Sequence, residues 1–181
     1  MKNITILLLA FILVFTSCSK EDVEPSDDNE LITTVKLSFK SPTGIVKSFY
    51  WRDKQGDGVI DSVDPILLDR NTAYEMTISL LDETKNPVFD ISEEIEEESD
   101  VHLFVYKVTP LGLVGVQIKD LDKNGLPIGL KADVRSQYVP GNGKFQVILK
   151  HQPPVNGKAG KTGSEEGGST DVDVSFPLTV Q

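Results

Sequence analysis

Residues 74–80 read Tyr-Glu-Met-Thr-Ile-Ser-Leu, an unbroken alternation of apolar and polar side chains. Successive side chains of a β-strand point to opposite faces, so this alternation predicts a strand with one apolar, buried face. The same period of two recurs from Leu31 onward, between turns rich in Gly, Pro, Asn and Asp, and helical periodicity is nearly absent. We therefore expect an all-β domain.

About eight strands are expected after residue 30, without the alternation of strands and helices that a parallel sheet requires. This arrangement favours an immunoglobulin-like two-sheet sandwich, with a closed barrel as the alternative. The expected strands lie near residues 35–39, 45–51, 74–80, 101–108, 114–118, 128–134, 145–149 and 172–180.

One acidic segment departs from the strand pattern. Ile91 and Ile95 stand four residues apart, behind Asp90 and Glu93, which have the spacing of a capping box. This segment, from Asp90 to Ser99, is expected to form a short surface helix.

The first eighteen residues have the pattern of an export signal. Lys2 precedes an apolar run at residues 4–15 that is too short to span a bilayer, and Thr16-Ser17-Cys18 closes it. A secretory signal with a chance cysteine, or an uncleaved anchor, would explain the same run. We expect a signal peptide at residues 1–17, a lipidated Cys18 with a flexible acidic tether at residues 18–30, and the β-sandwich domain at residues 31–181.

Composition narrows the classes of partner. The formal net charge is −10 and the lysines form no stripe, so nucleic acid is not an expected partner. Cys18 is the single cysteine, and with Cys18 used for lipid attachment no thiol is left for a disulfide, a thiolate metal site or a cysteine nucleophile. Acyl chains on Cys18 would attach the protein to a membrane, since each buried CH2 contributes about 0.8 kcal/mol.

An acidic, glycine-containing stretch between Asp53 and Asp64 has the spacing of a calcium loop. Oxygen-bearing side chains stand at loop positions 1, 3, 5, 9 and 12, with glycine at position 6, and clustered oxygens suit a hard cation. The alternative is a turn whose Asp side chains accept hydrogen bonds from their own backbone. The candidate ligands are Asp53, Gln55, Asp57, Asp61 and Asp64.

A second acidic turn runs from Asp120 to Gly125 with the spacing D-x-D-x-N-G, but Lys131 stands where the twelfth ligand would be. A hairpin explains this turn more simply. Asn124-Gly125 is the preferred pair for a type I′ turn, in which both central residues have positive φ.

The two histidines, His102 and His151, both fall in expected strands, and His151 shares the parity of the inward row at residues 145–149. A hydrogen-bonded structural histidine is one outcome. A two-histidine metal site is the other, if the two strands are neighbours and an Asp or Glu joins them. Since no catalytic motif is recognisable elsewhere, we expect no enzymatic activity.

Seven segments resemble, in order, those of a group of small outer-membrane lipoproteins of Bacteroidota: TSCSKED, LITTVKLSF, RDKQGDG, DISEEIEEESDVHLFVY, DLDKNGLPIG, LKHQP and TDVDVSF. The resemblance covers nearly the whole chain. The acidic run Lys20-Glu21-Asp22 resembles the signal that directs such lipoproteins to the outer leaflet, which implies display at the cell surface.

The function expected from these observations is that of a non-enzymatic, lipid-anchored envelope protein. It would act as a surface binding or accessory subunit, beside an outer-membrane uptake system. The alternative is a lipoprotein that binds a metal ion, calcium or zinc.

Overall fold

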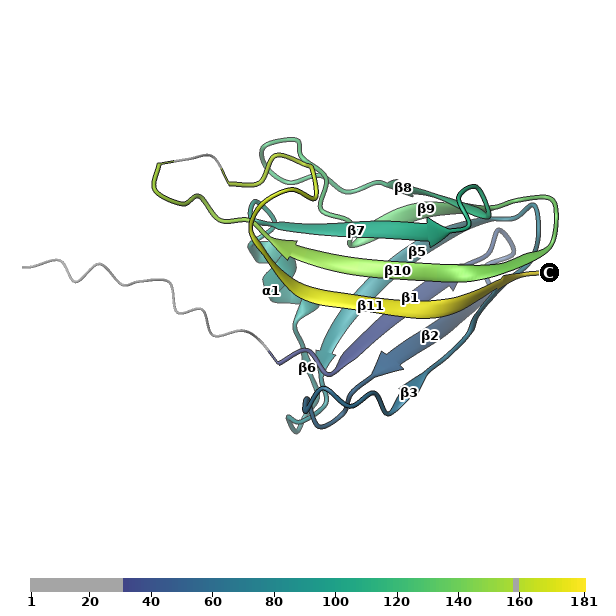
Figure 1. The fold of residues 1–181 in the computed structure, drawn as a ribbon, viewed down its shortest axis with the longest axis horizontal. Coiled ribbons are helices and arrows are strands. Elements are labelled where there is room, and N and C mark those ends of the chain that lie inside the picture. Colours follow the sequence, from purple (N-terminus) through teal and green to yellow (C-terminus); the bar gives the residue numbers. More distant parts are fainter. Residues whose placement is uncertain (1–30, 158–159) are drawn as a thin grey trace, which may run out of the picture.

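The computed structural model describes residues 31–157 and 160–181. The signal peptide, Cys18 and the tether expected at residues 1–30 lie outside the described residues. The described chain forms two mainly antiparallel β-sheets packed face to face, with one short helix at one end (Figure 1).

Sheet A has the strand order β3-β2-β1-β5-β9-β8, and β6 pairs with β5. Sheet B has the order β4-β11-β10-β7, in which β4 runs parallel to β11. The sheet A strands are β1 (Thr34–Lys40), β2 (Val46–Arg52), β3 (Ser62–Val63), β5 (Ala73–Asp82), β6 (Phe89–Asp90), β8 (Val114–Ile118) and β9 (Lys131–Ser136). Those of sheet B are β4 (Ile66–Leu68), β7 (His102–Thr109), β10 (Gly141–His151) and β11 (Ser169–Val180).

The expected two-sheet sandwich is confirmed, and the closed barrel is excluded. Eight strands have five or more residues, and they are the eight that the sequence predicts; the three others have two or three residues. The strand at residues 74–80 lies inside β5, with its apolar side chains buried and the intervening ones exposed or half-buried. Local alternation therefore determines which faces become the core.

The core lies between the two sheets. Phe39 of β1 makes edge-to-face contacts with Phe49 and Tyr74 of its own sheet and with Phe145 of sheet B, at ring-centroid distances of 5.8, 6.1 and 6.3 Å. Such edge-to-face pairs stabilise beyond their buried area, by about 0.5–1.5 kcal/mol each. Phe39 is thus a link between the sheets.

The strand expected at residues 128–134 begins later, at Lys131. Gly129 has a φ of +101°, and an added Cβ would lie 2.6 Å from the Cβ of Phe104. The Ile128 carbonyl instead accepts a hydrogen bond from the Phe104 amide of β7 at 2.7 Å. Ile128 and Leu130, on either side of Gly129, are buried.

The expected helix forms as α1 (Ser92–Glu97), but the capping box is wrong. Ile91 is the N-cap residue, and no side chain caps the helix. The Asp90 carboxylate accepts a hydrogen bond from the Ser92 amide at 3.0 Å, as part of a turn before the helix. Buried Ile91 and Ile95 hold α1 against the core.

The expected type I′ turn at Asn124-Gly125 is also wrong. Gly125 has a φ of +77°, while Asn124 does not have a positive φ. The Gly125 amide donates to the Asp122 carbonyl and the Asp122 amide to the Leu126 carbonyl, which is a three-residue hairpin loop with glycine in the left-handed position. Asp122 selects this loop because its carboxylate accepts from the amides of Asn124 and Leu126.

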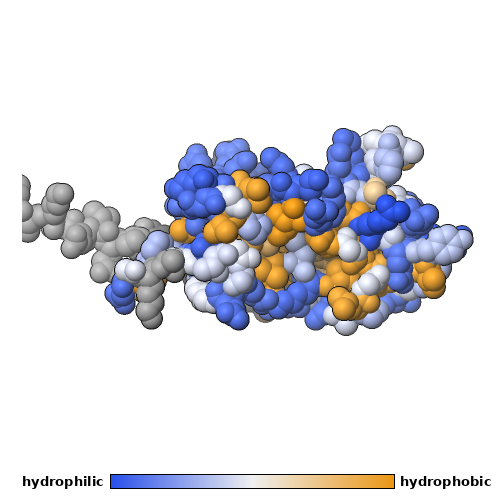
Figure 2. All heavy atoms as spheres, turned by 90° about the horizontal axis from the view of Figure 1, so that it is seen from above, coloured by the Kyte–Doolittle hydropathy of each residue, from blue (hydrophilic) through white to orange (hydrophobic). Residues whose placement is uncertain are grey.

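The strands β7 and β8 are free edges of the two sheets on the same side of the sandwich. A crevice of about 230 Å³ lies between them and is lined mainly by apolar residues. Figure 2 views this side from above and shows hydrophobic side chains exposed between hydrophilic ones. In the described residues, no helix has the length and apolar character needed to cross a bilayer.

Candidate metal centre

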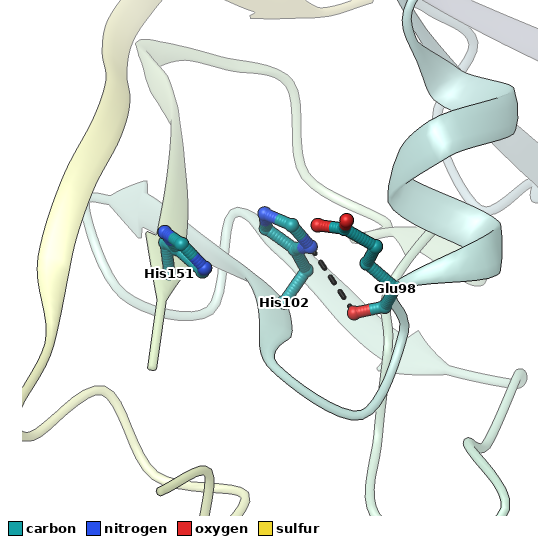
Figure 3. Close-up of side chains that lie close together, drawn as sticks. All are labelled: Glu98, His102 and His151. Carbon is teal, nitrogen blue, oxygen red and sulfur yellow. Dashed lines mark hydrogen bonds between the residues drawn. The ribbon is translucent and has the colours of Figure 1, made fainter. Parts of the chain in front are cut away.

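The register of sheet B brings the two histidines together. His102 is the first residue of β7 and His151 the last of β10, and the two are direct cross-strand partners. Their rings stack, with centroids 4.7 Å apart and an interplanar angle of 15° (Figure 3). The first condition for a two-histidine site, that the strands be neighbours, is therefore met.

Glu98 meets the second condition. It is the C-cap residue of α1, and the chain turns back from it so that the Val101 amide donates to the Glu98 carbonyl at 3.0 Å. This turn places β7 beside the helix end. One carboxylate oxygen of Glu98 and one ring nitrogen from each histidine all lie within 4.8 Å of one another.

The protonation state of His102 follows from its surroundings. His102 is 6% exposed, and burial lowers its pKa; the nearby His151 lowers the pKa further, while the Glu98 carbonyl opposes both. His102 is therefore neutral at neutral pH. Neutral imidazole is the form that binds a metal ion.

The tautomer of His102 follows from a hydrogen bond. Nδ1 lies 3.1 Å from the Glu98 carbonyl oxygen, and because a carbonyl can only accept, Nδ1 carries the proton and donates. The lone pair of His102 is then on Nε2. A backbone carbonyl that orients a histidine through its other nitrogen is a common feature of metal sites.

Coordination of one ion requires a change in the stack. Zinc binds imidazole nitrogen at about 2.0–2.1 Å, and two nearly parallel rings do not aim their lone pairs at a common point. At least one ring must turn. His151 is the freer of the two, because it is half-buried and Nδ1 of His102 is held by Glu98.

In the acidic stretch that resembles a calcium loop, the first carboxylate, that of Asp53, binds backbone amides. Asp53 is buried, and its two oxygens accept hydrogen bonds from the amides of Gly56, Asp57 and Gly58 at 2.7–3.2 Å. An ion at this position would compete with three amide donors. The carboxylate stabilises a glycine-containing turn.

The other Asp side chains of this stretch also bind backbone amides, which is the alternative weighed from the sequence. Among residues 31–157 and 160–181, one group of three or more His, Cys, Asp or Glu has ligand atoms that converge, and it consists of Glu98, His102 and His151. The acidic stretch around Gln55 does not form such a group. Asp57 accepts from the Val59 amide at 2.9 Å, Asp61 from Lys54 at 2.7 Å and Asp64 from Tyr50 at 3.0 Å.

In the second acidic turn, Asp122 forms a buried ion pair. Lys161 Nζ lies 2.9 Å from the Asp122 carboxylate and also donates to the Ser99 carbonyl at 2.8 Å; the side chains of the pair are fully buried. Burial would raise the pKa of Asp122, but hydrogen bonds from Leu126, Lys161 and Asn124 lower it. This carboxylate fastens the segment before β11 to the rest of the domain.

Sequence reasoning missed Glu98 as an individual ligand, because the five Glu between residues 93 and 98 look alike. The sequence contains one indication that Glu98 differs from the other four. Glu98 precedes His102 by four residues across a helix end, where the chain can reverse and bring the two side chains together. No protein-family model, curated protein or solved structure was found that matches the chain, so the candidate centre rests on its own geometry.

Proposed function

We propose that this chain is a non-enzymatic envelope protein that binds a divalent metal ion of the zinc class through Glu98, His102 and His151. The observation that carries the proposal is the convergence of two imidazoles and a carboxylate within 4.8 Å. Two of these ligands come from different strands and the third from a helix end, so the fold itself assembles the set.

The chemistry of the ligands favours zinc over calcium. Imidazole nitrogen suits zinc and its neighbours in the first transition row, whereas calcium takes six to eight oxygen ligands. Glu98 is exposed, so water can complete the coordination sphere from that side. Two histidines and one carboxylate leave room for such a further ligand.

Isothermal titration calorimetry of the full chain in detergent, with zinc and with calcium chloride, tests the proposal. Zinc should bind saturably at one site and raise the melting temperature, because an ion that binds the folded state stabilises it. Calcium should give neither effect. A zinc titration without heat, and with an unchanged melting temperature, would refute the proposal.

Two neighbouring glutamates offer a matched pair of variants. Glu98→Gln and Glu97→Gln each remove one negative charge from the same helix end, but Glu98 alone belongs to the converging set. We expect Glu98→Gln to weaken zinc binding by at least about tenfold and Glu97→Gln to leave it nearly unchanged. Equal losses in both variants would indicate a general effect of charge and not coordination.

We also propose that Cys18 is acylated and anchors the domain at the outer membrane, facing the cell surface. The support comes from the apolar run, the small pair Thr16-Ser17 before the cysteine, and the acidic residues behind it. Labelled palmitate should enter the native chain and not a Cys18→Ser variant. Equal labelling of both would refute acylation at Cys18.

One observation favours a second role, as an accessory subunit that contacts another envelope protein. The loops at residues 110–113 and 137–140 lie at the end of the sandwich where the C-terminus is found (Figure 1). The Gln137 amide donates to the Leu113 carbonyl and joins the two loops. Leu111 is 97% exposed, and Tyr138 and Val139 are also exposed. Clustered apolar side chains of this kind mark interaction sites.

Cross-linking in intact outer membranes tests this role. The native chain should capture a defined membrane protein, and a Leu111→Asp, Tyr138→Asp variant should lose it. Capture that is unaffected by these two changes would refute these loops as the contact.

A further inference from the structure

A cleft with charged and apolar lining residues lies on the outer face of sheet A, on the side opposite to the core. Its volume is about 720 Å³, which is in the range of small-molecule sites. The strands β1, β5, β8 and β9 form its floor, and the turn at residues 41–44 adds a wall.

The strand register places the lining residues in two neighbouring rows. One row crosses all four strands and is polar throughout. The next row consists of Ala73, Arg135 and Gly115. Arg135 is thus flanked on both sides by residues with a methyl group or no side chain, and this is why the face is hollow there. The polar row is Lys40, Glu75, Asp133 and Gln117.

Gly115 is not required by the backbone of β8. It does not have a positive φ, and an added Cβ would meet nothing closer than the Arg135 carbonyl oxygen at 4.0 Å. Glycine inside a strand weakens the strand, and it often marks a place where a ligand approaches the backbone closely. The missing side chain keeps the cleft open and has no other structural reason in its surroundings.

Arg135 is the unmatched charge in the cleft. Lys40 pairs with Glu75 at 2.9 Å, and Asp133 pairs with Lys119, beside the cleft, at 3.0 Å. In the part of the chain that the structure describes, the Arg135 guanidinium has no ion-pair partner within 4.0 Å. The cleft therefore has one free positive charge beside two carboxylates and an amide.

We propose that this cleft binds a small polar molecule through a carboxylate group held by Arg135. A planar guanidinium matches a carboxylate with two parallel hydrogen bonds. The oxygens of Glu75 and Asp133 and the amide of Gln117 are placed in the next row to bind hydroxyl or ammonium groups on the rest of the molecule. Because the chain has a net charge of −10, the local geometry must select this anion against an unfavourable overall field.

NMR titration of the full, ¹⁵N-labelled chain in detergent tests the proposal, with D-glucuronate, L-glutamate and D-glucose as probes. At least one of the two carboxylates should shift the amide signals of Gly115, Gln117 and Arg135 saturably, and D-glucose should not. Preference for D-glucuronate would identify hydroxyl partners, and preference for L-glutamate an ammonium partner. No saturable shift with either carboxylate, or equal shifts with D-glucose, would overturn the proposal.

Two variants separate binding from folding. Gly115→Val places a side chain in the cleft beside Arg135, with room for its Cβ, and puts a β-branched residue in a strand, so it should abolish binding while the melting temperature stays equal or rises. Arg135→Gln should weaken binding at least tenfold, and Arg70→Gln, outside the cleft, should not. Binding that persists in Gly115→Val or Arg135→Gln would refute the assigned site.

Discussion

The acidic turn at residues 53–64 and the cluster of Glu98, His102 and His151 are two candidate cation sites with different geometry. The turn has more ligand-type side chains, but four of its carboxylates accept hydrogen bonds from backbone amides. The cluster has three side chains from separate elements that converge. The difference teaches that many carboxylates close together in a sequence do not by themselves bring their oxygens to one point.

The largest expected effect is a loss of zinc affinity when ligands of the cluster are removed. Replacing both His102 and His151 by Ala removes two of three ligands and should weaken zinc binding at least about a hundredfold, equivalent to about 2.7 kcal/mol. The control is Asp57→Ala with Asp61→Ala, which should leave zinc affinity unchanged. Calorimetry on the two double variants measures both. A comparable loss of zinc affinity in the control would indicate that the acidic turn, too, binds zinc.

The next effect concerns the stability of the turn. Asp53→Ala leaves three backbone amides without their acceptor, and hydrogen bonds to a charged group contribute about 1.5–3 kcal/mol. We expect the free energy of unfolding to fall by about 2–3 kcal/mol. Urea denaturation measures this change. A variant as stable as the native chain would contradict the structural role assigned to Asp53.

A smaller effect is expected at the exposed side of the same turn. Asp61 accepts one hydrogen bond, from the Lys54 amide at 2.7 Å, and its side chain is in water. Asp61→Ala should cost about 0.5 kcal/mol, because water can replace the lost acceptor. If urea denaturation instead gave a loss equal to that of Asp53→Ala, burial would not be what distinguishes the two carboxylates.

The structure predicts the direction in which folding stability changes with pH. The pKa of His102 in the folded chain lies below its ordinary value of 6.5, mainly because of burial. Between these two pKa values the unfolded chain binds more protons, so stability should fall as the pH drops below 6.5. Denaturation at several pH values should show a weaker acid dependence for His102→Gln. An identical dependence in both proteins would contradict the assignment to His102.

Much of the fold could be predicted from the sequence because alternation is a local property. The strand at residues 74–80 and most of the other long strands follow from side-chain parity, and the strand at residues 101–108 follows from an apolar run. The strand boundaries that were predicted wrongly depend on contacts with residues far away in the sequence. The strand expected from Ile128 begins at Lys131, because the segment around Gly129 passes close to Phe104.

The candidate sites were predictable in part. Parity places His151 on the inward face of its strand, but its contact with His102 requires knowing that β7 and β10 are neighbours. Lys161 lies in a polar, glycine-rich stretch, and its complete burial follows from an ion pair with a residue 39 positions away. Gly115 and Arg135 form a site only through the register of β8 and β9.

Anomalous diffraction at the zinc absorption edge, from crystals of the chain grown with zinc, tests the metal centre most directly. We predict a peak bounded by Glu98, His102 and His151, with Nε2 of His102 at about 2.0–2.1 Å from the ion. A peak at the acidic turn with none at the histidines would contradict the account.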